Sequence, residues 1–119
     1  MELARKLQIK PGSTLAMLCL PQGVLVPMPQ DVTTNADAGT ADAVVAFVLH
    51  TADLDDGAAA ALTAAREDRL AWLAYPKAGK LGTTLNRDRL ASEAATRGVQ
   101  PVRQVAIDDV WTALRFRPL

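Results

Sequence analysis

The part of the sequence richest in groups that could hold a ligand is residues 76–86, PKAGKLGTTLN, with two lysines, two glycines and two threonines. A helical pattern begins directly after it, so its end supplies the free N–H groups of a helix start. Such groups and flexible glycine backbone can surround a phosphate or carboxylate, while a lysine adds charge. This loop therefore predicts an anion site, the alternative being a solvated loop whose lysines serve solubility. The expected ligand contacts are Lys77, Lys80, Thr83, Thr84 and Asn86, together with His50.

Other reactive side chains each have a structural alternative. Cys19 lies between two leucines, which favours a buried apolar residue over a nucleophile. His50 is the only histidine, and a lone histidine at a strand end more often satisfies a backbone carbonyl than abstracts a proton. Zinc needs three or four His, Cys or carboxylate ligands, and no such cluster occurs. We expect no catalytic residue, no metal and no cofactor.

Two further patterns lie near the end of the chain. Asp108 and Asp109 precede Trp111 and could form a polar site, but aspartates in a turn usually satisfy their own backbone. Arg115 alternates with apolar neighbours on a predicted strand, and if that strand is interior it needs a carboxylate partner. Asp108 or Asp109 is near enough in sequence to supply one.

Three apolar runs position these groups. Residues 14–20, 43–49 and 70–75 are short continuous apolar stretches bounded by turn residues, which is typical of buried strands. Residues 54–65 show helical spacing, with Asp53 as the expected N-cap, and residues 87–98 show it again, between Asn86 and Gly98. Strand and helix in alternation predict a parallel sheet with right-handed crossovers.

The remaining elements close the domain. Residues 102–107 predict a fourth strand, and residues 111–117 return from it as an antiparallel hairpin. Residues 24–42 resist assignment because prolines and polar residues break any period, so apart from a short edge strand at 24–26 we expect the most mobile internal segment there. The prediction is a single α/β domain over residues 1–119, Rossmann-like and three-layered, with a mostly parallel sheet closed by the hairpin. Ligands bind beyond the carboxyl ends of such strands.

Composition excludes several classes of partner. Thirteen basic and thirteen acidic residues leave no net field to attract nucleic acid or an anionic membrane. No apolar run approaches the roughly 20 residues that cross a bilayer. The polar beginning is unlike a signal peptide, and the single cysteine cannot form an internal disulfide. We expect a cytoplasmic protein.

Residues 6–21, 70–90 and 102–118 together resemble a family of small bacterial domains of unknown function, over nearly the whole chain. The succession of elements is also similar to the second half of a class I methyltransferase. That resemblance implies a last strand inserted antiparallel between residues 70–75 and 102–107, giving the order first, second, third, fifth, fourth. It does not extend to the cofactor site, because the turn after the first strand supplies one glycine and residues 24–42 offer no strand with a terminal acidic residue.

We therefore expect a non-catalytic binding module that holds a small anion or a nucleotide-like ligand at the carboxyl edge of its sheet. Two alternatives stay open. One is a protein–protein interaction domain without a small ligand, and the other is a degenerate methyltransferase-like enzyme. The sequence gives no indication of the oligomeric state.

Overall fold

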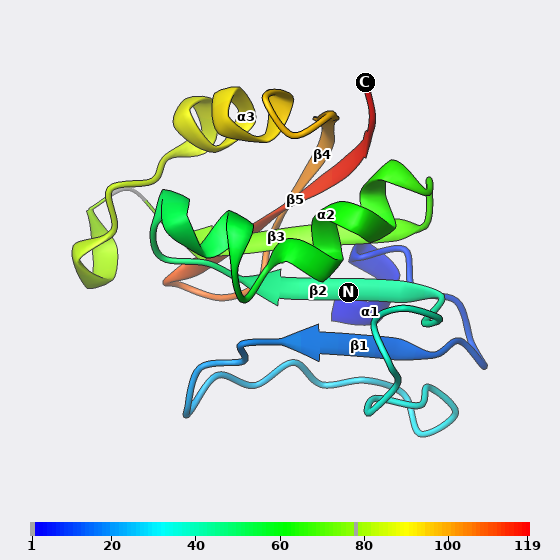
Figure 1. Cartoon of the computed structure of the whole chain (residues 1–119). Coiled ribbons are helices and arrows are strands. Elements are labelled where there is room, and N and C mark those ends of the chain that lie inside the picture. Colours follow the sequence, from blue (N-terminus) through cyan, green and yellow to red (C-terminus); the bar gives the residue numbers. More distant parts are fainter. Residues whose placement is uncertain (1, 78) are drawn as a thin grey trace.

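A computed structural model describes residues 2–77 and 79–119 and contains one five-stranded sheet. The described elements, in chain order, are α1 (Leu3–Lys6), β1 (Leu15–Leu18), β2 (Ala43–Phe47), the 3-10 turn η1 (Thr51–Asp55), α2 (Ala59–Arg66), β3 (Leu70–Pro76), the 3-10 turn η2 (Lys80–Gly82), α3 (Arg87–Ala95), β4 (Val99–Ala106) and β5 (Trp111–Pro118) (Figure 1). Within these ranges no helix has the length and apolar character needed to cross a bilayer.

The sheet has the order β1-β2-β3-β5-β4. β1 and β2 pair in parallel, as do β2 and β3, whereas β5 is antiparallel to both β3 and β4. The predicted strand order and the C-terminal antiparallel hairpin are therefore confirmed. The arrowheads of β1 and β2 point to the same end of the sheet, which is its carboxyl edge (Figure 1).

The predicted Rossmann-like, three-layer architecture with a mostly parallel sheet is wrong. One reversed strand in the interior makes two interfaces antiparallel at once, so the sheet is mixed. The helices are also unevenly distributed, because α2 and α3 pack on the same face. The opposite face is covered by the four-residue α1 and by irregular chain around Val32. The prolines between β1 and β2 prevent a helix in that crossover, which a third layer would require.

Each face of the sheet has its own apolar core. On one, Leu62 of α2 and Leu90 of α3 pack on strand residues that include Leu114. On the other, Leu7 packs around Trp72, whose indole Nε1 donates a hydrogen bond of 3.0 Å to the Leu7 carbonyl. Because the indole is fully buried, this bond fixes the chain after α1 on the sheet.

Several local expectations hold and others need correction. Asn86 caps α3 by accepting from the Arg89 N–H at 2.8 Å, as predicted. Gly98 has the predicted left-handed conformation, with φ +86°, but α3 already ends at Ala95, with Thr96 as its C-cap. Asp108 Oδ1 accepts hydrogen bonds from the N–H groups of Val110 and Trp111 and so forms the predicted structural turn. Asp53, by contrast, is not an N-cap: His50 precedes the 3-10 turn, and Asp53 lies inside it.

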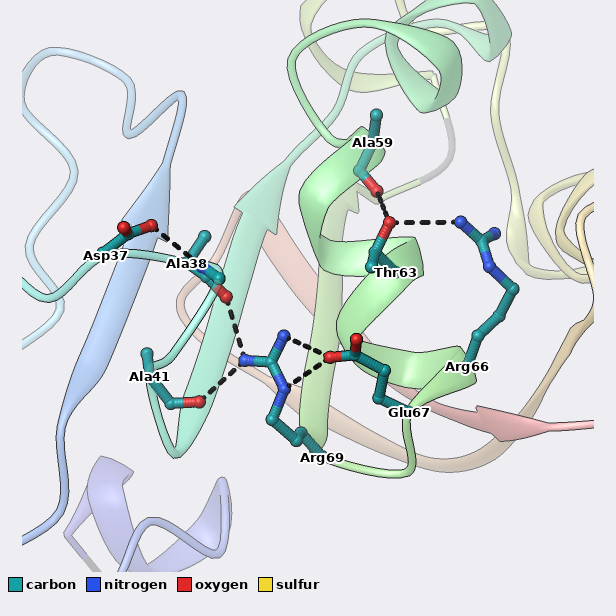
Figure 2. Close-up of polar contacts among 9 residues, drawn as sticks. Asp37, Ala38, Ala41, Ala59, Thr63, Arg66, Glu67 and Arg69 are labelled. Carbon is teal, nitrogen blue, oxygen red and sulfur yellow. Dashed lines mark hydrogen bonds and ion pairs between the residues drawn. The ribbon is translucent and has the colours of Figure 1, made fainter.

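The crossover between β1 and β2 is irregular but tethered. Residues 24–26 form no strand, whereas Thr33 exchanges backbone hydrogen bonds with Ser13 and Leu15 at the outer edge of β1. Figure 2 shows a second tether, in which Arg69 Nη1 donates to the carbonyls of Ala38 and Ala41 at 2.9 and 2.8 Å. Its Nε and Nη2 bind Glu67 Oε1 on the other side. The mobility expected for residues 24–42 stays a prediction.

Candidate functional site

A cavity of about 410 Å³ opens at the carboxyl edge of β1 and β2, where a ligand was expected. Phe47, the last residue of β2, contributes to its wall, as do Asp53 of η1 and Trp111, the first residue of β5. The lining consists of Cys19, Pro21, Phe47, Leu49, Asp53, Asp56, Gly57, Leu81 and Trp111. A volume of this size suits a small organic molecule.

Two aromatic rings make the firm part of the cavity wall. Phe47 and Trp111 meet edge to face, with ring centroids 5.2 Å apart and an interplanar angle of 79°. Both side chains are buried, since they are 4% and 3% exposed. Rings held in this way offer a rigid apolar surface that loses little conformational entropy when a ligand binds.

Another part of the lining depends on a close approach between Cys19 and Gly57. β1 ends at Leu18 because Cys19 turns the chain with φ +57°, which leaves the residue exposed at the cavity. A Cβ at position 57 would lie 2.5 Å from Cys19 Sγ. The expectation of a buried, apolar Cys19 is therefore wrong, and glycine at 57 is needed for this packing.

The charged groups of the cavity are carboxylates. Asp53 accepts hydrogen bonds from the N–H groups of Leu49 and His50 at 2.8 and 3.0 Å, so its charge is partly compensated. Asp56 is exposed, and its side chain makes no hydrogen bond to the described residues. A cavity with apolar walls and a carboxylate at its rim favours a cationic or hydrogen-bond-donating ligand over an anion.

The predicted ligand residues lie beside this cavity without lining it. Thr83 Oγ1 donates to the Leu49 carbonyl at 2.6 Å and accepts from the Leu85 N–H at 3.0 Å, and Asn86 is occupied as the α3 cap. Lys80, Thr84 and His50 are exposed. Lys77 is half-buried, and its backbone N–H donates to Val110 O at 2.7 Å.

In two places the neighbour of a predicted residue lines the cavity instead. Leu49 precedes His50, and Leu81 follows Lys80. Leu81 is 62% exposed and has a φ of +54°, which is an unfavourable backbone conformation for a leucine. The sequence does not predict this conformation. The apolar lining was not predicted, because apolar residue types do not by themselves distinguish a ligand site from a core. The signal available was the pair of apolar residues at the end of one strand and the start of another, Phe47 and Trp111.

Tyr75, at the carboxyl end of β3, is not a candidate base. Burial raises the pKa of its phenol above the usual value of 10.0, so it stays protonated at neutral pH. No group of three or more His, Cys, Asp or Glu side chains that could hold a metal ion occurs in residues 2–77 and 79–119.

No family model matches the chain, and no curated protein matches it. The resemblance to small bacterial domains and to methyltransferases therefore stays a prediction.

Proposed function

We propose that this chain is a binding module whose ligand occupies the carboxyl-edge cavity and undergoes no reaction there. The observation that carries the proposal is the lining itself, which combines the rigid pair Phe47 and Trp111 with the carboxylates Asp53 and Asp56. The position of the cavity at the carboxyl ends of β1 and β2 supports the proposal, because ligands commonly bind at that edge of parallel strands. The chemistry of the lining supports a small apolar or aromatic molecule with an amine or another hydrogen-bond donor.

The loop that carries Lys77 and Lys80, here called the lysine loop, contributes Leu81 to the cavity wall in this proposal and is not an anion site. Thr83 ties the loop to the Leu49 carbonyl, which holds Leu81 at the cavity mouth. An anion bound by Lys77 and Lys80 would have to lie outside the cavity, in solvent. That variant of the function stays open and is an arm of the test below. We keep the cytoplasm as the proposed compartment, with the single cysteine as its support.

Two fragments of the same shape and opposite charge, benzylamine and benzoate, test the proposal by amide chemical-shift mapping. Benzylamine is expected to perturb Phe47, Leu49 and Trp111 with an affinity near millimolar, as for other ligands of this size. Asp56→Asn should weaken it several-fold, because an exposed carboxylate contributes about 1 kcal/mol or less to an ion pair. Asp31→Asn is the matched control, since Asp31 is exposed and lies outside the cavity lining.

The other outcomes discriminate between the alternatives. If benzoate binds and Lys77→Ala/Lys80→Ala abolishes that binding with the fold intact, the loop is the anion site expected from the sequence. If neither fragment perturbs the cavity, the module has no small-ligand site here. An interaction domain without a small ligand is then the better description.

A further inference from the structure

A second cleft lies at the opposite, amino edge of the sheet and has the reverse chemistry. Its volume is about 650 Å³, within the range of small-molecule sites. Two cations, Lys10 and Arg115, line it together with Gln8, Ser13 and one carboxylate, Asp42. The part of the chain that follows α1 thus meets the interior strand β5 here.

Arg115 is short of partners although its strand is interior. The sequence predicted a carboxylate from Asp108 or Asp109, and this is wrong: Asp108 is occupied by its own turn at the far end of β5. The guanidinium instead donates one hydrogen bond of 2.8 Å, from Nη1 to Gln8 Oε1. Its Nε is buried and has no hydrogen-bond partner. A buried donor without an acceptor costs about 1–3 kcal/mol, so the fold alone gives no reason for this arginine.

The carboxylates near this edge are hydrogen-bonded to other groups, although the charge of Asp68 also acts on Arg115. Asp42 accepts from the Thr14 N–H and from Thr14 Oγ1, at 2.9 and 3.2 Å. Asp68 is paired with Arg117 through two bonds of 2.9 and 3.0 Å. In addition, Arg103 stands directly opposite Arg115 in the β4–β5 register, a like-charge pair that destabilises a sheet.

The wall of the cleft is held in place by the contacts in Figure 2. Arg69 fixes the carbonyl of Ala41, which directly precedes the lining residues Asp42 and Ala43. The residue after Arg69, Leu70, lines the cleft from β3. The hydrogen bond from Arg69 to Ala41 therefore fixes the first residues of β2 relative to those of β3, and the cleft is formed before any ligand binds.

We propose that this amino-edge cleft binds a small molecule through a phosphate or carboxylate group, with Arg115 as its main contact and Lys10 as a second cation. The guanidinium matches the planar, forked geometry of such oxyanions, and a small rotation offers Nε and Nη2 to two of their oxygens. An oxyanion here supplies the acceptor that Arg115 lacks and relieves its repulsion with Arg103. This site is independent of the carboxyl-edge cavity.

Titration with inorganic phosphate and, separately, with citrate tests the proposal by chemical-shift mapping at physiological salt. We expect perturbation of Gln8, Ser13 and the Arg115 Nε–H. Arg115→Met should weaken binding about ten- to a hundredfold, the value of a charge-assisted hydrogen bond, and Lys10→Gln should weaken it less. Arg89→Gln is the control, because it removes an exposed guanidinium that lies outside the lining of the cleft.

Response to phosphate alone, to citrate alone or to both supports the site and identifies the preferred oxyanion. The proposal is overturned if neither anion binds at concentrations up to about 20 mM, well above the range of specific metabolite sites. It is also overturned if Lys77→Ala/Lys80→Ala, and not Arg115→Met, abolishes binding. Should Arg115→Met fail to fold, Arg115→Lys keeps the charge without the fork, and unchanged affinity in that variant would contradict the assigned geometry.

Discussion

Thr83 and Leu49, 34 positions apart in the chain, are joined by a hydrogen bond of 2.6 Å from the threonine hydroxyl to the leucine carbonyl. The same hydroxyl accepts from the Leu85 N–H. One side chain thus connects the end of β2, the lysine loop and the entry to α3. The loop that the sequence marked as a ligand site is therefore also a structural joint.

Replacing Thr83 by valine keeps the volume and removes both hydrogen bonds. We expect a loss of about 1–3 kcal/mol in the free energy of unfolding, measured by urea denaturation, because two partly buried backbone groups lose their partner. Thr84→Val is the matched control. Thr84 is exposed, so its substitution should change stability by less than about 0.5 kcal/mol. Equal effects at the two positions would contradict the role given to Thr83.

Trp72→Phe tests the attachment of the N-terminal segment. The change removes the indole donor to the Leu7 carbonyl and leaves a space in a fully buried site, so we expect a cost of about 2–4 kcal/mol. Amide exchange should accelerate over residues 3–10. Trp111→Phe removes an indole from the same face without breaking a described hydrogen bond, and the exchange of residues 3–10 should stay near that of the unmodified protein.

Gly57→Ala should cost about 1–3 kcal/mol, since its Cβ would collide with Cys19 Sγ and the thiol or the turn must move. Adding Cys19→Ala removes the obstructing sulfur and should restore most of the lost stability, which a double-mutant cycle of melting temperatures measures. Gly39→Ala serves as the control, because its nearest described neighbour is 3.5 Å away. Additive effects of the two substitutions would show that the contact is unimportant.

Two exposed ion pairs predict the acid limb of the stability curve. The hydrogen bond from Arg117 holds the pKa of Asp68 below its usual 3.8, and Arg97 does the same for the pKa of Asp55. The unfolded state then binds more protons than the native state, so the stabilisation is complete above about pH 4 and disappears as the pH falls through the lower native pKa values.

Asp68→Asn should therefore flatten the decline of melting temperature below pH 4, and added salt should weaken the effect in the original protein. Asp31→Asn, which changes an exposed aspartate with no described hydrogen bond, should keep the original slope. An unchanged slope in Asp68→Asn would mean that the pair with Arg117 does not persist in solution.

The first three strands were predictable because each is a short apolar run between turn residues. The start of α3 was predictable from Asn86, a residue type that commonly caps helices. The order of the last two strands was predicted from the resemblance to methyltransferases. Local sequence patterns do not show which distant segments pair in a sheet. The prediction of a third layer was wrong because the proline-rich crossover between β1 and β2 excludes a helix there.

The sites were less predictable than the fold. Neither the carboxyl-edge lining nor the cleft at Arg115 follows from neighbours in sequence, because both join segments that meet only after the sheet forms. Backbone conformation was a second obstacle. Gln8 and Cys19 each adopt a positive φ of about 60°, and no residue type at these positions signals it. Gln8 lines the amino-edge cleft and Cys19 lines the carboxyl-edge cavity, so both sites depend on turns that the sequence does not predict.

The place of β5 in the sheet has a consequence for synthesis of the protein. The strand made last among those described lies in the interior, between β3 and β4. Until it leaves the ribosome, β3 has an open edge and β4 has no neighbour in the sheet. Vectorial folding from the N-terminus can therefore assemble β1, β2 and β3 but cannot complete either apolar core, and the nascent chain exposes a strand edge able to pair with other chains. Completion waits for Arg115 and its neighbours, so the cleft that this arginine lines forms only when the whole sheet does.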